Sequence, residues 1–389
     1  MGRVVIVALL LGSGVAQEAI RYGKAADVEM SAEVLDAGAS LFREAVEADR
    51  LRGVVLLVAR KGVVVLHEAY GWRDVDRTKP MTKDSLFRMA SNTKPVIATA
   101  ILQLVEAGKL KLDAPVKTYL PSFDNDRAGD ITVRHLLTHT SGFRIGRIFL
   151  SPLLEKSKAH PSAPSLRAEV DRFGAIGAKV VPGTSYRYSN PGFNTLGALI
   201  EVASGMPMKA YLKERIYDPL GMTDSCNHES DADRKRMSAV FRPIKSGSGA
   251  GPWRTSWTPA EPPDYPFPRA SGGMVSTALD YARFCQMYLN GGVSRDARIL
   301  GDALIAQATE PQTKGLFPKV VQRNRKRSFY GFGWSVRGQV HSHSGSDGTY
   351  AWVDKARDII GIVFTQSPGG TNPRDQFRRI TDAACWDER

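Results

Sequence analysis

The sequence predicts an α+β protein, in which an antiparallel β-sheet flanked by helices is interrupted by an inserted, mainly helical domain. Two observations favour this class. Paired apolar segments joined by short turns occur near both ends of the 389-residue chain, as expected for β-hairpins. Segments with helical spacing of apolar residues fill its middle. We therefore expect a discontinuous α/β domain at residues 30–120 and 330–389, around a helical domain at residues 121–329.

The N-terminal half of the predicted sheet begins with a helix. Residues 31–49 carry an apolar stripe that includes Leu35 and Phe42, at the spacing of an amphipathic helix. Two apolar segments follow at residues 53–59 and 63–70, and a short turn that ends at Gly62 separates them. Because tight turns join antiparallel neighbours, we expect a hairpin here.

The C-terminal half repeats this arrangement. Residues 349–353 and 359–365 form a second predicted antiparallel pair, and residues 374–387 form a closing helix. We expect both hairpins to belong to one sheet. Between them, helices are predicted to start near Thr132, Phe193, Met208 and Leu279.

One long segment resembles neither domain. Residues 245–270 are polar and rich in glycine and proline, which predicts a lid-like loop. The aromatic residues of this loop either line an apolar acyl or alcohol pocket or anchor the loop to the body of the protein. Both interpretations stay open for Trp253, Trp257, Tyr265 and Phe267.

The charge pattern argues against a nucleic-acid partner. The formal net charge is +13, but no zinc-finger spacing, RNP-type motif or basic helix accompanies it. The densest basic cluster, at residues 319–327, is expected to be a solvated face rather than a polyanion site. The hydrophobic content of 42% is enough for a substantial core. The sequence gives no indication of the oligomeric state.

Three widely spaced cysteines, Cys226, Cys285 and Cys385, indicate neither a disulfide framework nor a metal site. At the N-terminus, an apolar run at residues 4–11 is too short to span a bilayer. Small residues before Gln17 favour a secretory signal at residues 1–16 and export to the periplasm or the medium. A misplaced start codon, or an N-terminal strand of a cytoplasmic protein, is the alternative.

Ser91 and Lys94 are the strongest candidates for catalytic residues. They are three residues apart at the start of an apolar-periodic run, so they share one helical face. This S-x-x-K spacing places a nucleophile beside a base, and the unpaired N–H groups of a helix start favour developing negative charge. Alone, the motif also fits a helix-capping serine beside a solvated lysine.

Two further motifs follow in order: Tyr188-Ser189-Asn190 and His343-Ser344-Gly345. The trio S-x-x-K, Y-x-N and H-x-G resembles the serine β-lactamase and penicillin-binding-protein-like superfamily, in its class C-like branch and closest to the family VIII carboxylesterases. The resemblance covers residues 35–365 and includes the segments DSLFRMA at 84–90, LTHTSG at 137–142 and GGMVST at 272–277.

The resemblance implies a β-lactamase/transpeptidase-like fold and a division of labour in the site. Ser91 attacks an acyl carbon, while Lys94 and Tyr188 take and relay its proton; which of the two is the formal base stays open. The family motif implies that Asn190 orients Lys94 and the acyl group. The backbone N–H groups of Ser91 and Ser346 form the oxyanion hole, and Gly345 permits close approach. No cofactor or metal is required.

Substrate class depends on the third motif. Relatives that recognise a carboxylate carry lysine where this chain has His343, and imidazole is mostly neutral at pH 7. An ester needs only the nucleophile, the relay and the oxyanion hole, so we expect a carboxylesterase with weak β-lactam hydrolysis. We expect His343, Trp253, Trp257 and Phe149 to contact a small ester or β-lactam-like substrate.

Other activities remain open at this point. The enzymatic alternatives are a class C-like β-lactamase, a D-stereospecific peptidase or amidase, and an acyltransferase. The non-enzymatic alternative is a penicillin-binding sensor that is acylated without turnover, because competence for deacylation is not visible in a sequence.

Overall fold

The computed structural model describes residues 19–146, 151–244, 253–263, 265–294, 297–317 and 327–386. The predicted signal at residues 1–16 and the predicted pocket residue Phe149 therefore lie outside the described residues, as does most of the basic cluster at residues 319–327. Within the described ranges, no helix is both long and apolar enough to cross a bilayer.

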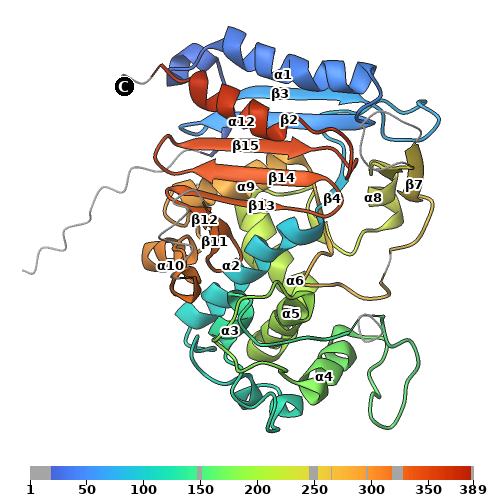
Figure 1. Ribbon diagram of the computed structural model, residues 1–389, viewed down its shortest axis with the longest axis vertical. Coiled ribbons are helices and arrows are strands. Elements are labelled where there is room, and N and C mark those ends of the chain that lie inside the picture. The colour runs from blue at the N-terminus through green and yellow to red at the C-terminus, as the bar shows by residue number, and fades with distance from the viewer. Residues whose placement is uncertain are drawn as a thin grey trace, which may run out of the picture.

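A mixed but mainly antiparallel sheet joins the two ends of the chain (Figure 1). In the described part it has eight strands, in the order β1 (Arg21–Tyr22), β3 (Val63–Gly71), β2 (Gly53–Arg60), β15 (Ile359–Phe364), β14 (Thr349–Asp354), β13 (Val340–Ser344), β12 (Ser335–Arg337) and β11 (Phe329–Tyr330). Only β1 runs parallel to its neighbour. The predicted hairpins pair directly, since β15 lies antiparallel to β2 with Phe364 opposite Val55.

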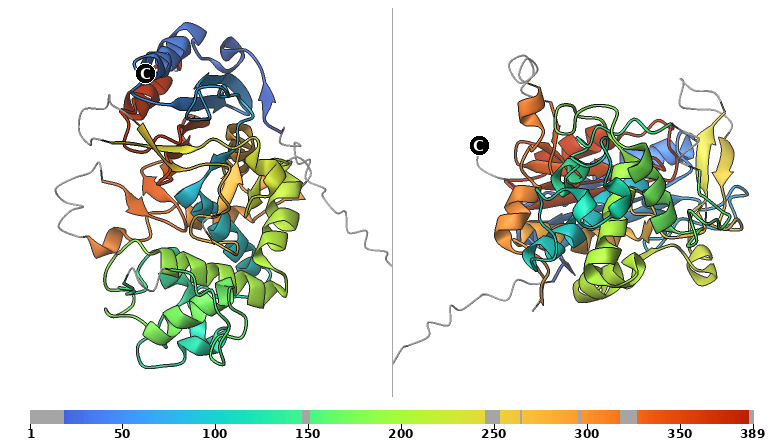
Figure 2. Two further views of the ribbon diagram at one scale, coloured as in Figure 1. Left: turned by 90° about the vertical axis from the view of Figure 1, so that its right-hand side faces the viewer. Right: turned by 90° about the horizontal axis from the view of Figure 1, so that it is seen from below.

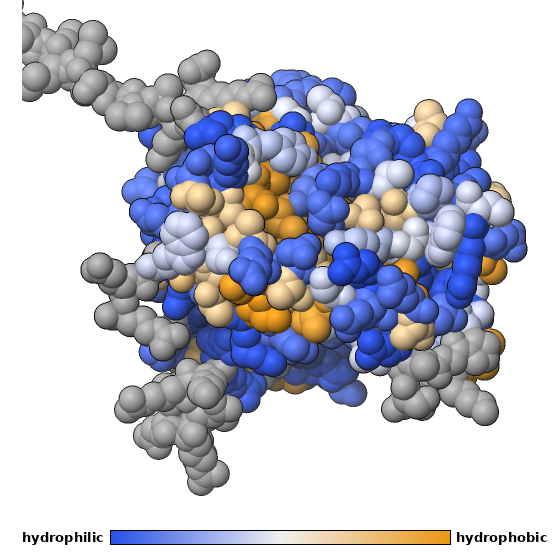
Figure 3. Space-filling model, turned by 90° about the horizontal axis from the view of Figure 1, so that it is seen from above, coloured by the Kyte–Doolittle hydropathy of each residue, from blue (hydrophilic) through white to orange (hydrophobic). Residues whose placement is uncertain are grey.

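Helices cover both faces of this sheet. Helices α1 (Ala32–Glu47) and α12 (Arg374–Ala383) lie against one face, and α9 (Ala278–Leu289) lies against the other (Figure 1). Strand β2 is buried along its whole length, with alternate residues in two separate cores, as the period of two requires. Seen from above, the face of the molecule is mostly hydrophilic, and its apolar residues gather in one narrow band (Figure 3).

The helical region lies at one end of the molecule, below the sheet (Figure 2). It contains α3 (Val133–Leu137), α4 (Leu166–Ile176), α5 (Asn190–Ser204) and α6 (Met208–Leu212). Helix α2 (Thr93–Glu106) packs against α5 and shares one hydrophobic core with the inner face of the sheet. The start of α2 therefore lies where the helical region meets the sheet.

The remaining elements are short. A three-stranded sheet has the order β4 (Phe87–Arg88), β8 (Met274–Ser276), β5 (Cys226–Asn227), and β6 (Val240–Pro243) pairs with β7 (Trp253–Trp257). Strands β9 (Val293–Ser294) and β10 (Ala297–Arg298) form a further pair. The described residues also include the short helices α7 (Asp218–Leu220), α8 (Asp231–Arg234) and α10 (Asp302–Ala308), and a π-helical turn at Lys213–Tyr217.

Three expectations need correction. The segment expected as a loop at residues 245–270 contains β7, because its alternating Trp253–Trp257 sequence pairs with β6. The closing helix ends at Ala383 rather than at residue 387. Helix α9 packs on the sheet although it falls within residues 121–329, so the predicted domain boundaries do not separate the layers.

Candidate active site

A strained turn presents Ser91. Strand β4 ends at Arg88, and Ala90 takes a left-handed conformation with φ of 44° before the single 3₁₀ turn Ala90–Asn92 leads into α2. A non-glycine residue in this region costs energy, and such strain concentrates at functional sites. The Thr93 hydroxyl donates to the Ala90 carbonyl at 2.7 Å and holds the turn. Ser91 is thus half-buried at the start of α2, one 3₁₀ turn earlier than a regular helix start.

Lys94 is fully buried next to Ser91. Its Nζ lies 3.0 Å from Ser91 Oγ and donates to the Ser271 carbonyl oxygen at 2.6 Å. The same nitrogen lies 4.7 Å from the centroid of the Tyr188 ring. None of the ion pairs among the described residues involves it. Burial lowers the pKa of Lys94 well below its ordinary value, and the nearby charge of Arg269 lowers it further. Both effects favour the neutral amine, which has a free lone pair.

Tyr188 lies on the other side of the nucleophile. Desolvation raises the pKa of its phenol above the ordinary value, and a hydrogen bond with the Ser91 side chain opposes that rise. The residue is 40% exposed, so part of the ring faces the solvent. A protonated phenol here can give or pass on a proton, but it is not a phenolate base. The structure thus brings together the first three predicted residues, Ser91, Lys94 and Tyr188.

His139 supports Tyr188 from behind. Its ring lies 4.2 Å from the Tyr188 ring and 4.5 Å from the Tyr330 ring, centroid to centroid. Its Nδ1 accepts the backbone N–H of Ser189 at 3.0 Å. Burial lowers the pKa of His139 well below its usual value, with the charge of Lys94 acting in the same direction. His139 is therefore a neutral packing partner of the Tyr188 loop.

His343 is buried and hydrogen-bonded within the protein. Its Nδ1 must donate, because its partner at 3.0 Å is the Ser344 carbonyl oxygen; Nε2 then accepts from the Tyr330 hydroxyl at 3.0 Å. Burial lowers the pKa of His343 to about 3, and Lys94 contributes in the same direction. A neutral imidazole agrees with the expectation from the sequence. Both ring nitrogens are used inside the protein and the residue is 6% exposed, so the imidazole has no free nitrogen to offer a substrate.

The backbone supplies the donors for an oxyanion. The N–H of Ser346, in the turn after β13, has no hydrogen-bond partner among the described residues. Gly345 brings the turn after β13 against the nucleophile loop: a Cβ at this position would collide with the Thr349 hydroxyl and the Met89 carbonyl. Ser346 follows Gly345 in this turn.

Three other predicted residues form no hydrogen bond with Ser91, Lys94 or Tyr188 in the described part of the chain. The amide oxygen of Asn190 is buried without a hydrogen-bond partner, and Lys94 is held by Ser271 instead. The Trp253 indole N–H donates to the Asp49 carbonyl at 3.0 Å, so this ring anchors β7 to the loop after α1. Trp257 is buried in a small satellite core. Both tryptophans therefore anchor their segment to the body of the protein and do not line the pocket.

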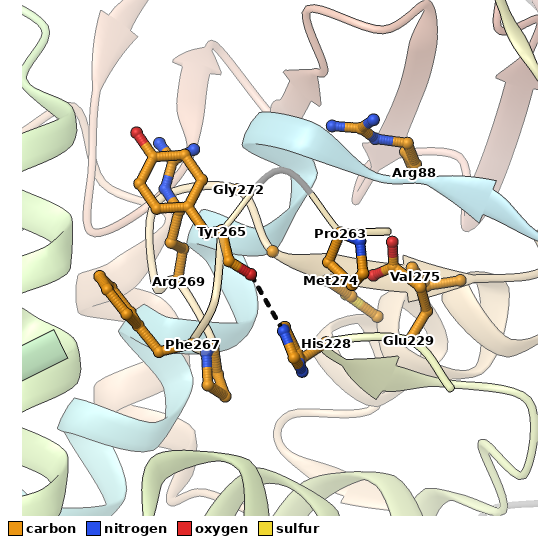
Figure 4. A pocket seen from close by; sticks show the side chains of 12 residues that line it. Arg88, His228, Glu229, Pro263, Tyr265, Phe267, Arg269, Gly272, Met274 and Val275 are labelled. Carbon is orange, nitrogen blue, oxygen red and sulfur yellow. Dashed lines mark hydrogen bonds between the residues drawn. The ribbon is translucent and has the colours of Figure 1, made fainter. Parts of the chain in front are cut away.

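A pocket lies next to the segment that follows Arg269 (Figure 4). Its lining includes Arg88, His228, Tyr265, Phe267, Arg269 and Met274, whereas Ser91, Lys94 and Tyr188 are not among its lining residues. The wall at Gly272 lies against the backbone of Ala90, next to Ser91. In Figure 4 the Arg269 guanidinium stacks on the Tyr265 ring, 3.7 Å from its centroid, and the His228 imidazole bonds the Tyr265 carbonyl at 3.0 Å. Arg88 pairs with Asp347 and lies over Trp257.

Sequence patterns did not point to several residues of this site. Ser271 and Arg269 adjoin the GGMVST segment, which marks the wall, but no pattern showed that the Ser271 carbonyl binds Lys94. His228 lies far away in the sequence. In the described ranges, no group of three or more His, Cys, Asp or Glu side chains is arranged to hold a metal ion.

Comparison with known proteins gives consistent similarities. The family model described as Beta-lactamase matches residues 39–384. Esterase EstB of Burkholderia gladioli is 32% identical over 289 residues, which cover 67% of this chain and 72% of the esterase. Penicillin-binding protein 4 of Amycolatopsis lactamdurans is 30% identical over 314 residues, 77% of each chain. The solved structure of EstCE1, a hydrolase with promiscuous acyltransferase activity, covers 90% of this chain and 99% of its own with a TM-score of 0.72 at 22% identity.

Proposed function

Because this chain belongs to the β-lactamase family and is a serine hydrolase, we propose that it cleaves carboxylic esters through an acyl-enzyme on Ser91. The observation that carries the proposal is the contact between a buried amine and the candidate nucleophile, Lys94 Nζ at 3.0 Å from Ser91 Oγ. Burial lowers the pKa of this lysine, which favours the neutral form that a general base requires.

Acylation follows from this arrangement. Lys94 takes the proton of Ser91 while Oγ attacks the ester carbonyl carbon, and the carbonyl oxygen becomes an oxyanion. The N–H groups of Ser91 and Ser346 bind that oxyanion, at about 3 kcal/mol for each well-placed donor. The C–O bond to the alcohol then breaks. Tyr188 gives its proton to the leaving alkoxide and regains one from Lys94, so the alcohol leaves neutral and the acyl group stays on Ser91.

Deacylation reverses the same proton path with water as the nucleophile. Water gives a proton to the Lys94–Tyr188 pair and attacks the acyl carbon, and the serine oxygen recovers a proton as the C–O bond to Ser91 breaks. The products are a carboxylic acid and free enzyme. A penicillin-binding sensor would stop before this step, so turnover separates an enzyme from a sensor.

The substrate class is argued from His343 and from the relatives. A neutral, buried imidazole with both nitrogens occupied offers no charge to a substrate carboxylate at the third motif. EstB, the esterase at 32% identity, supports an ester as substrate. The pocket whose wall at Gly272 borders Ala90 has aromatic walls at Tyr265 and Phe267, which suit the acyl or alcohol part of a small ester. Weak hydrolysis of β-lactams is a side activity of the same chemistry.

Activity measurements on the purified protein test this proposal. We expect p-nitrophenyl esters of short acids to give a kcat/KM that exceeds the value for nitrocefin by at least 100-fold, with little activity on D-alanyl peptides. Ser91→Ala should remove turnover, and mass spectrometry after treatment with an alkyl phosphonate should find the adduct on Ser91. Nitrocefin turnover as efficient as that of p-nitrophenyl acetate would make β-lactamase the better assignment. An adduct on another serine would overturn the mechanism.

Export remains a separate proposal. The apolar run at residues 4–11 and the small residues that follow it support cleavage after Ala16. N-terminal sequencing of the protein from its native host tests this: a mature chain that starts at Gln17 supports export, and an intact N-terminus in the cytoplasm contradicts it.

A further inference from the structure

A buried glutamate lies at the far end of a hydrogen-bond chain that leads to the catalytic lysine. Glu169 is on the inner face of α4 and is 1% exposed. The Asn194 side-chain amide, on the neighbouring helix α5, donates its N–H to Glu169 Oε2 at 2.8 Å. The mechanism above uses neither residue, although buried charged side chains are costly unless they have a partner and a purpose.

The chain continues from Asn194 to the active site. Asn194 Oδ1 accepts the backbone N–H of Ser271 at 2.9 Å, and the Ser271 carbonyl accepts from Lys94 Nζ at 2.6 Å. Asn194 and Ser271 are each 2% exposed, and Lys94 is fully buried. Each link is therefore shielded from water, where a hydrogen bond is stronger and the loss of one partner is more costly.

The donor and acceptor of each hydrogen bond in this series are determined by the Ser271 N–H. The Ser271 N–H can only donate, so Asn194 must present its oxygen to Ser271 and its NH₂ group to Glu169. Residue 169 must therefore accept. With Asn194 held in this orientation, the Ser271 backbone has hydrogen bonds at both its N–H and its carbonyl group. The carbonyl therefore stays directed at Lys94 Nζ. A lysine amine that donates one N–H to this carbonyl keeps its lone pair directed at Ser91 Oγ.

We propose that Glu169 and Asn194 are positioning residues, which aim the Lys94 amine at Ser91 through the Ser271 carbonyl. This inference rests on the proposed role of Lys94 as the base. Two arginines face Glu169: Arg269, which also bonds the Ser271 hydroxyl at 3.1 Å, and Arg172 on the same helix. Burial raises the pKa of Glu169 to about 7, against the opposing effects of Arg269, Asn194 and Arg172.

A reversal of the hydrogen bond between residues 169 and 194 tests the proposal. Asn194→Asp still accepts from Ser271, but its other oxygen then meets the Glu169 carboxylate, so the two must repel or share a proton. Glu169→Gln alone keeps an acceptor for Asn194. In the double variant, the new glutamine amide donates to the new aspartate and the chain is complete again, with its polarity reversed at this one bond.

The readouts are the rate of Ser91 phosphonylation and kcat/KM on p-nitrophenyl acetate. At pH 8 we expect Asn194→Asp to lose at least 10-fold in both, Glu169→Gln to stay within about 3-fold of the parent, and the double variant to recover to within about 3-fold. At each pH, the rates of Asn194→Asp are divided by those of the parent. This ratio should move closer to one from pH 8 to pH 6, because a shared proton replaces the repulsion between the two carboxylates. A merely structural role would lower the melting temperature without this pH-dependent ratio.

Controls keep the outcomes separable. Glu201 is a half-buried glutamate on α5 that accepts the Met208 N–H at 3.1 Å and has no link to Lys94, so Glu201→Gln should leave both rates unchanged. If the Asn194 variants do not fold, Glu169→Met, which cannot accept, should lose at least 10-fold where Glu169→Gln does not. Equal rates for these two, or an Asn194→Asp deficit that Glu169→Gln fails to relieve, would overturn the inference. Phosphonylation reports on Ser91 whatever the natural substrate is, so an absence of ester hydrolysis would refute the proposed function alone.

Discussion

The surroundings of Lys94 Nζ determine which residue of the candidate site acts as the base. Lys94 Nζ contacts a backbone carbonyl, a serine hydroxyl and an aromatic face, and the described residues place no carboxylate in an ion pair with it. An ammonium there would be poorly solvated, so burial lowers the pKa of Lys94, while desolvation raises that of Tyr188. Both shifts favour a neutral lysine beside a neutral phenol. We therefore assign the first proton transfer to Lys94, a choice that the sequence motif left open.

The pH dependence of acylation should report on this lysine. Activity requires the neutral amine, so kcat/KM rises as the pH passes above the pKa of Lys94. Arg269 helps to hold that pKa down, after the larger effect of burial. Arg269→Met removes the opposing charge, so the pKa of Lys94 should rise and the acid limb of the profile should move to higher pH by about half a unit to one unit. Arg269→Lys keeps a positive charge and is the matched control. An acid limb that stays in place in Arg269→Met would mean that another group titrates there.

A second prediction concerns the cooperation of Lys94 and Tyr188. Tyr188→Phe removes one hydroxyl and Lys94→Ala removes the amine, and each should lower kcat by roughly 10³-fold or more. Since both residues belong to one proton path through Ser91, the double variant should lose little beyond the worse single variant. Steady-state kinetics on one p-nitrophenyl ester measures all three. Losses that multiply would place the two residues in independent steps.

At the scale of elements, β13 shows what a motif can and cannot predict. The order of S-x-x-K, Y-x-N and H-x-G correctly placed Gly345 at a close approach to the nucleophile loop. It did not show which way His343 points, because that depends on Tyr330 from the edge strand β11. The positions of Trp253 and Trp257 could not be predicted either. Their aromatic character suited a pocket, but because β7 pairs with β6 these side chains lie in anchoring positions. Long-range pairing of short strands leaves no local pattern.

The burial of His343 determines the outcome expected for His343→Lys. A lysine in the same place would bury an ammonium group near Lys94 and leave the Tyr330 hydroxyl without its acceptor. We expect a loss of about 3 kcal/mol or more in folding free energy at pH 7. The buried lysine has a lowered pKa, so the loss should shrink as the pH rises toward 10, where the unfolded chain also becomes neutral. Chemical denaturation at pH 7 and pH 9.5 measures this, with His343→Gln as the control that keeps a donor and an acceptor. Unchanged stability would mean that the side chain can turn toward the solvent.

At the scale of the whole molecule, the predictable part of the fold was the part with strong periodicity. The helix at residues 31–49 and the hairpins near both ends were predicted within a few residues, because their apolar positions recur at a clear period. We expected the two hairpins to belong to one sheet, and the pairing of β15 with β2 confirms this. The hydrogen-bond chain from Glu169 to Lys94 was not predictable, since its four residues come from four separate segments and their meeting depends on tertiary packing.

The two cores of the molecule imply that stability and catalysis can be changed separately. Phe377 of α12 is fully buried on the face of the sheet that carries α1, with its ring 5.5 Å from that of Phe42. Ser91 lies on the opposite side, at the start of α2, which belongs to the other core. Phe377→Ala should therefore cost about 3–5 kcal/mol of folding free energy through the lost contacts and the cavity that remains. The kcat on an ester should be unchanged at temperatures where the variant is folded.

Thermal denaturation and kinetics at 20 °C measure the two effects, and Val181→Ala, at a residue that is 69% exposed, provides a control of similar chemistry. A fall in kcat that parallels the loss of stability would show that the outer helices also control the geometry of the site, through a sheet that transmits changes between its two faces.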